Sequence, residues 1–178
     1  MLYLWIIAAI AIMFYLINIY NKFIFLEKNA KNAWIQIDIN IKLRNDLLPL
    51  LVNIVKGYSN YEKNTLKELT ELRLDFINSK NISNKILINE KINNSIKLFF
   101  ANAEKYPELA ANKSFLKLQS EISKLESNIA FKRQFYNDTV NKFNNFLMSF
   151  PSNIVGKMLG FESLESFSYN SEYKKVKL

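Results

Sequence analysis

Two otherwise apolar helical patterns in this chain are interrupted by polar residues, at Asn40 and Arg44 in the first and at Lys132 and Thr139 in the second. The polar and charged side chains at and near these interruptions are the residues best suited to chemistry. The set comprises Asp38, Asn40, Arg44, Glu126, Arg133, Asn137 and Asp138. Carboxylates beside a guanidinium could bind an ion or a ligand, or carry out acid–base catalysis. The same residue types also form closed polar layers that fix the alignment of helices in a bundle. We favour the structural layer and keep the functional site as the alternative.

Composition narrows the chemistry that these residues could support. The 178 residues include no His and no Cys, which excludes thiol nucleophiles, disulfides and zinc sites built from nitrogen and sulfur ligands. The commonest general base near neutral pH is therefore missing. With 3 Gly in total, a glycine-rich phosphate-binding loop is excluded as well. We expect no cofactor, no metal and no catalytic residue, and we predict that the protein is not an enzyme.

The basic charge of the chain is spread out rather than gathered. The net charge is +8, and lysines recur singly, as at Lys85, Lys91 and Lys97. A nucleic-acid binder usually concentrates its cations on one face. The pattern therefore indicates solvated helix faces and no nucleic-acid partner.

The N-terminal segment has the composition of a membrane anchor. Residues 1–21 carry no charged side chain, and residues 2–17 are all apolar or aromatic. About 20 helical residues, at ~1.5 Å each, span the ~30 Å hydrocarbon core of a bilayer. A cleavable signal peptide would need a basic start and a small-residue site after the apolar run, and a core helix would need a polar face. We predict a single-pass transmembrane helix at residues 1–21, in contact with lipid.

Flanking charges predict the orientation of this helix. No Lys or Arg precedes it, whereas Lys22, Lys28 and Lys31 follow closely. The positive-inside rule then places the N-terminus outside the cell (inner) membrane and the bulk of the chain in the cytoplasm.

Beyond the anchor, apolar residues recur at the three-and-four spacing of helices. The pattern predicts helices over about 22–57, 62–76, 84–106 and 112–149, with a kink at Pro49. Two long and two shorter helices with short loops indicate an all-α fold, an elongated antiparallel bundle of about four helices at residues 22–150. Antiparallel alignment of the long helices would set Phe23 level with Phe150. It would also bring the polar interruptions together at mid-bundle.

Residues 151–178 are expected to form a short helix and a basic tail, the latter at residues 173–177. The segment 150–161 has too many large apolar residues for a free loop. Its candidate contact residues are Phe150, Ile154, Val155, Lys157, Met158, Leu159 and Phe161. One interpretation is an amphipathic helix at the membrane interface. The other, which we favour, is a plug that closes the membrane-proximal end of the bundle.

Several blocks of the sequence carry a family resemblance. Residues 34–38 (WIQID), 44–49 (RNDLLP), 126–140, 150–155 (FPSNIV) and 160–161 closely resemble the LemA family of bacterial membrane proteins. The resemblance covers nearly the whole chain in order, although an Arg that the family often has between Asn128 and Ile129 is missing, and residues 76–85 are less typical. It implies one N-terminal span, a helical bundle and a cytoplasmic body. It implies no activity, because the family has no agreed biochemical function.

These observations favour a membrane-anchored, non-enzymatic interaction or scaffold protein that presents helix faces to a protein partner. The partner is unknown, and a second copy of the chain would serve as well, giving a homo-oligomer. Two alternatives stay open. The first is a membrane-associated enzyme or regulator that uses the carboxylate and arginine cluster. The second is a lipid-interacting, membrane-organising module that acts through residues 150–161.

Overall fold

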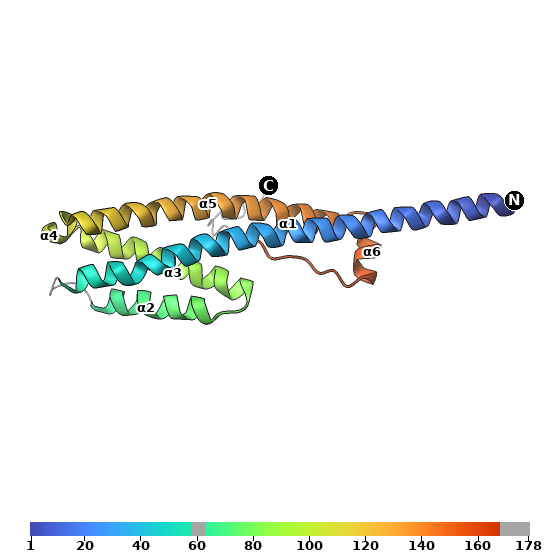
Figure 1. Ribbon diagram of the computed structural model, residues 1–178. Helices are drawn as coiled ribbons and strands as arrows, with labels where there is room; N and C mark the ends of the chain where they lie inside the picture. Colours follow the sequence, from blue (N-terminus) through green and yellow to red (C-terminus); the bar gives the residue numbers. More distant parts are fainter. Residues whose placement is uncertain (58–62, 168–178) are drawn as a thin grey trace, which may run out of the picture. The chain divides into compact units, whose positions relative to one another are not determined.

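The computed structural model describes residues 1–57 and 63–167, so the start of the second predicted helix and the basic tail lie outside the described residues. Within those ranges the chain is helical and contains no strand (Figure 1), which confirms the all-α prediction. The helices are α1 (Leu2–Lys56), α2 (Lys63–Asn78), α3 (Ile82–Ala103), α4 (Pro107–Ala110), α5 (Lys113–Met148) and α6 (Ser152–Met158).

Local sequence signals explain where several helices begin. Asn81 precedes α3, and its side chain accepts a hydrogen bond from the backbone N–H of Ser83. Asn112 precedes α5 and accepts from the backbone N–H groups of Ser114 and Phe115. These side chains satisfy backbone donors that have no partner inside the helix. Helix α4 starts with Pro107, a residue favoured at the first helical position because its missing N–H costs nothing there.

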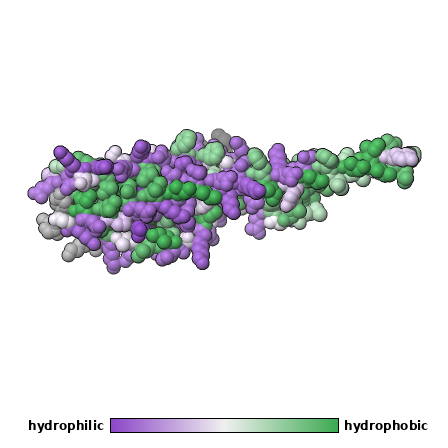
Figure 2. Space-filling model, in the orientation of Figure 1, coloured by the Kyte–Doolittle hydropathy of each residue, from purple (hydrophilic) through white to green (hydrophobic). Residues whose placement is uncertain are grey.

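Helix α1 continues without interruption through the apolar N-terminal segment and Pro49 to Lys56. Every side chain from residue 2 to residue 17 is exposed. Figure 2 shows the N-terminal part of α1 as a nearly unbroken hydrophobic surface. Among the described residues, α1 is the one helix long and apolar enough to cross a membrane.

The chain divides into two compact units, and both long helices contribute to each. The first unit comprises residues 1–34 and 133–178, and the second comprises residues 35–132.

The second unit is a helical bundle in which α2 and α3 pack side by side. Its apolar core draws on α1, α2, α3, α4 and α5. Deeply buried members include Ile37, Ile41, Leu48, Leu51, Val55, Leu69, Phe76, Ile92, Ile96, Phe99, Leu109, Phe115 and Ile122. Phe99, Phe100 and Phe115 form an aromatic cluster with ring centroids between 5.6 and 6.4 Å apart. Such edge and tilted ring contacts add to the stabilisation that burial provides.

The first unit packs around the buried ring of Phe23. This ring lies 6.0 Å from Phe143, 4.7 Å from Phe146 and 4.6 Å from Phe161. The predicted level of Phe23 with Phe150 is therefore wrong by about one helical turn. Helix α5 ends at Met148 and the chain turns away, which leaves the Phe150 side chain exposed.

Candidate functional site

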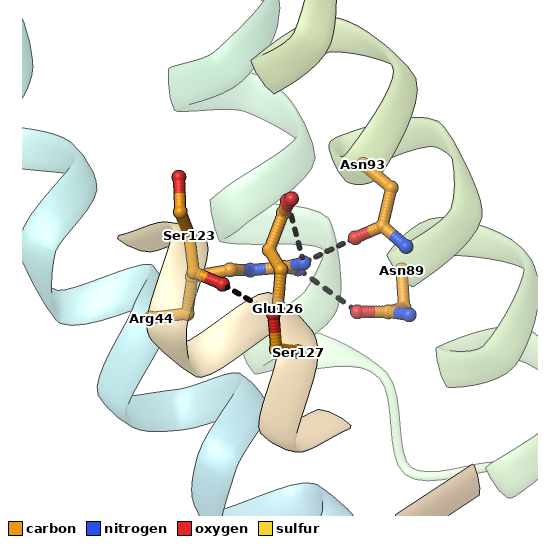
Figure 3. Close-up of polar contacts among 6 residues, drawn as sticks. All are labelled: Arg44, Asn89, Asn93, Ser123, Glu126 and Ser127. Carbon is orange, nitrogen blue, oxygen red and sulfur yellow. Dashed lines mark hydrogen bonds and ion pairs between the residues drawn. The ribbon is translucent and has the colours of Figure 1, made fainter. Parts of the chain in front are cut away.

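The most deeply buried charged side chain is Arg44, on the part of α1 that belongs to the second unit. Its guanidinium donates from Nη2 to Oδ1 of Asn89 at 2.8 Å and from Nη1 to Oδ1 of Asn93. Nη1 also lies 3.7 Å from Oε1 of Glu126. Figure 3 marks these contacts with dashed lines. The planar, permanently charged guanidinium suits such convergent acceptors.

Helix geometry explains how these partners reach Arg44. Asn89 and Asn93 are four residues apart on α3, so both amides lie on one face of that helix. Glu126 approaches from α5, and Arg44 itself comes from α1. The cluster therefore joins three helices of the second unit through one side chain.

The Glu126 carboxyl group has a pKa above its ordinary value. Desolvation by burial raises the pKa, and attraction to Arg44 and Lys97 offsets only part of that effect. At 3.7 Å the Arg44 pair is an ion pair rather than a hydrogen bond, and the Glu126 Oε1 atom accepts no hydrogen bond within the described part of the chain. The carboxylate thus balances the charge of Arg44 without a tight contact.

Asp38 forms a separate ionic cluster in the same unit. Its carboxylate oxygens lie 2.7 Å from Lys42 Nζ and 2.9 Å from Lys85 Nζ. Burial by itself would raise the pKa of Asp38, but the hydrogen bonds and positive charges of Lys42 and Lys85 outweigh it and lower the pKa. Lys85 also lies over the ring of Phe76 at 5.2 Å, so this ammonium is shared between an anion and an aromatic face.

The remaining predicted layer residues have other surroundings. Asn40 donates to the backbone carbonyl of Gln36 in its own helix. Asp138 is exposed and therefore does not sit in a buried layer. Arg133 and Asn137 belong to the first unit. The predicted single layer is thus resolved into two clusters of the second unit, around Arg44 and Asp38, and a third group in the first unit.

This third group holds an extended C-terminal segment, residues 161–167, against α5. We call this segment the strap. Asn137 donates to the carbonyl of Phe167 and accepts from its N–H, at 3.1 and 2.9 Å. Asn144 makes the same pair of bonds to Leu164, both at 2.9 Å. The Tyr136 hydroxyl donates to the carbonyl of Glu165 at 2.8 Å, while burial and then Glu165 raise the pKa of that hydroxyl.

The spacing of the two asparagines matches the spacing of the bonds that they make. Seven helical residues rise about 10.5 Å, and three extended residues span about 10 Å. Two asparagines one heptad apart on α5 can therefore pair with every third residue of the strap. Each side-chain amide bonds to both the N–H and the C=O of one strap residue, which is the pairing that a residue of a neighbouring antiparallel β-strand would make.

The strap ends in an aromatic contact. Phe167 is buried, with its ring stacked on Trp34 at 5.7 Å and edge-on to Tyr136 at 5.7 Å. The guanidinium of Arg133 lies over the same ring, 4.3 Å from its centroid. Arg133 thus makes a cation–π contact in the first unit.

The segment 150–161 has two different faces within the first unit. Ser152 and Gly156 are buried, and Val155 and Phe161 pack against the Phe23 cluster, as a plug would. The opposite side chains are exposed. They are Phe150, Ile154, Lys157, Met158 and Leu159.

Gly160 ends α6 with a positive φ of 75°, which permits the bond from the Phe161 N–H to the Gly156 carbonyl at 3.0 Å. This turn is the usual glycine-dependent helix ending, and it places Phe161 on Phe23.

Sequence reasoning missed the partners of the predicted residues. Asn89 and Asn93 occupy positions in line with the buried isoleucines of α3, and that spacing was the available signal. The one-heptad interval between Asn137 and Asn144 was a weaker one. Nothing in the local sequence indicates that Phe167 returns to Trp34.

This is an all-helical protein whose N-terminal helix begins with an exposed apolar stretch, and whose buried Arg44 side chain contacts polar side chains of two other helices. Similarity to known proteins identifies the family. The LemA family model matches residues 33–178, which includes both halves of the strap contact and the Arg44 cluster. The chain is also similar to Protein LemA of Metamycoplasma hominis, with 26% identity over 151 residues, covering 84% of this chain and 68% of that protein. The chain belongs to the LemA family.

Proposed function

We propose that the protein is a membrane-anchored, non-enzymatic interaction protein. Residues 1–21 cross the cell membrane once, the N-terminus lies outside, and the two helical units work in the cytoplasm. The observation that carries the proposal is the continuity of α1. One helix includes an uncharged apolar stretch, exposed from residue 2 to residue 17, and then supplies core residues to both units. A bilayer would cover a surface that water solvates poorly.

A protein partner has a suitable face in the second unit. Ile35, Ile39 and Leu43 recur every four residues on α1 and are exposed, so they form one apolar stripe along that helix. Isolated exposed apolar residues are ordinary, but a stripe at helical spacing is the kind of surface that another helix covers. A second copy of the chain would be one such partner.

The alternative of an enzyme that uses the Arg44 cluster is less well supported. Catalytic groups must meet a substrate, whereas the Arg44 side chain is completely buried and faces Asn89, Asn93 and Glu126. These contacts fit a structural charge better than a transition-state contact.

Site-specific photocrosslinking in intact membranes tests the interaction. A photoreactive residue at Leu43 should form discrete adducts with one protein species, identified by mass spectrometry. The same residue at Glu121, an exposed polar position of the second unit, is the matched control. Equal adduct patterns at both positions, or no protein adduct at Leu43, would contradict the proposed interaction face.

A further inference from the structure

Helix α6 carries an apolar stripe that the protein itself does not cover. Phe150, Ile154 and Met158 follow one another at four-residue intervals, and their side chains are 81%, 53% and 82% exposed. That spacing puts Ile154 and Met158 on one face of α6. Phe150 stands just before the helix, ahead of Pro151, and is exposed as well. Together the three large side chains give the surface of this segment an apolar character that water solvates poorly.

The other face of α6 fixes this stripe beside the end of the apolar part of α1. A Cβ atom on Gly156 would lie 3.0 Å from Cζ of Phe23 and 2.6 Å from Cδ1 of Leu147, so the α6 backbone packs directly on these side chains. Phe23 comes two residues after the uncharged segment 1–21. Helix α6 and the part of α1 up to Trp34 belong to the first unit, and Figure 1 shows α6 running across the direction of α1. If α1 enters a bilayer steeply, α6 lies along its surface.

Basic side chains occur at the same level. Lys22 is exposed on α1 and lies over the ring of Phe146 at 4.9 Å, and Lys157 is exposed on α6. A helix that lies in the interfacial region buries apolar side chains among acyl chains and keeps cations near the headgroups.

We propose that α6 is an interfacial helix whose Phe150, Ile154 and Met158 side chains enter the same membrane leaflet from which α1 emerges. The proposal rests on the membrane anchoring described above. It adds a second lipid contact, which would hold the first unit at a fixed height and tilt on an anionic bilayer.

Depth-dependent fluorescence quenching tests the proposal on the full chain. Because the sequence contains no Cys, single variants can be labelled cleanly with an environment-sensitive dye. Four variants of the full chain are placed in phosphatidylcholine vesicles containing phosphatidylglycerol and a quencher on the acyl chain. Ile154→Cys and Met158→Cys report on α6, Ile10→Cys reports on the anchor, and Gln134→Cys is an exposed α5 control in the same unit.

Quenching at Ile10, Ile154 and Met158, at least about twofold stronger than at Gln134, is the expected result for a helix seated among acyl chains. Quenching at Ile10 while both α6 labels behave like Gln134 would overturn the interfacial helix and leave the anchor intact. Labels on α6 that are shielded from water but not quenched by lipid would also overturn it, since a protein or a second copy then covers the stripe. Absence of quenching at Ile10 would contradict the anchoring itself.

Discussion

Arg44 concentrates three interhelical contacts in one side chain, and its replacement should be costly. In Arg44→Leu the buried amide of Asn89 and the half-buried Glu126 lose their cation. Removing one partner of a buried charge cluster destabilises by about 3 kcal/mol. For a chain of this size that corresponds to a drop of roughly 6–12 °C in the thermal midpoint, measured by circular dichroism in detergent.

Arg44→Lys is the informative companion variant. It keeps the charge but cannot donate to Asn89 and Asn93 at once, so its midpoint should fall between those of the parent and Arg44→Leu. A midpoint that does not move in Arg44→Leu would mean that the cluster contributes nothing to the bundle.

Asp38 should make the free energy of unfolding depend on pH in the acid range. The native pKa of Asp38 lies below its ordinary value, so its ionised form favours the folded state. That contribution is complete above the unfolded pKa, near ~4, and disappears as the pH falls through the lower native pKa. Asp38→Asn should therefore cost about 1 kcal/mol at neutral pH and progressively less below pH ~4.

Urea titrations at several pH values measure this difference. The exposed Asp138 provides the control, because Asp138→Asn should change the free energy of unfolding by less than about 0.5 kcal/mol. An Asp38→Asn penalty that stays constant from neutral to acid pH would exclude the ion pairs as its cause.

For individual residues, the sequence predicts the burial of Arg44 better than it predicts the partners of Arg44. Arg44 lies at a seam position of α1, so periodicity alone predicts its burial. Its main acceptors are asparagines of α3, which a search for opposite charges overlooks. Asp138 shows the opposite error, since proximity in sequence to Arg133 and Asn137 does not place a carboxylate on the buried face of a helix.

Helix α6 depends on the absence of a side chain at Gly156. A leucine there would push into Phe23 and Leu147, and overpacking of this kind costs typically 1–3 kcal/mol. Gly156→Leu should detach α6, visible as faster amide exchange over residues 152–161 in hydrogen-exchange mass spectrometry. Lys157→Leu adds the same side chain to the exposed neighbour and should leave exchange unchanged. Equal protection in both variants would show that close packing at Gly156 is not what holds the helix.

Replacing Asn137 and Asn144 of α5 should release the strap. Each of Asn137→Ala and Asn144→Ala deletes two hydrogen bonds to the strap backbone, each contributing about 1 kcal/mol. Amides of residues 161–167 should exchange faster in each single variant and fastest in the double variant. Asn145→Ala, at an exposed position beside Asn144, should leave the strap protected.

Helices with a long apolar periodicity and a capping residue are predictable from this sequence. The strap, which folds back against a helix far away in the sequence, is not. The predicted helix over about 112–149 agrees closely with α5, because its apolar seam is long and an asparagine marks its start. The strap is fixed by bonds between residues twenty to thirty positions apart, which leave no periodic pattern in the strap itself. The one-turn error in the alignment of Phe23 has the same origin, since the end of α5 and the return of Phe161 decide which rings surround it.

For the whole molecule, the continuity of α1 bears on the proposed interaction face. The apolar segment, the exposed stripe of Ile35, Ile39 and Leu43, and the Arg44 position belong to one helix, with no loop between them. A protein bound at that stripe would therefore contact the same helix that we propose as the anchor. Length and charge along the chain predict an apolar helix at this place, and the structure has one that is long and apolar enough to cross a membrane.

We propose that residues 1–21 are retained in the mature chain and reside in the bilayer. The most direct test is alkaline carbonate extraction of cell membranes, followed by intact-mass measurement of the recovered chain. We predict that the chain remains in the membrane pellet at the full mass expected for an uncleaved N-terminal segment. Deletion of residues 2–21 should move it to the supernatant. A full-length chain released by carbonate, or a chain shortened by the apolar segment, would contradict the anchor.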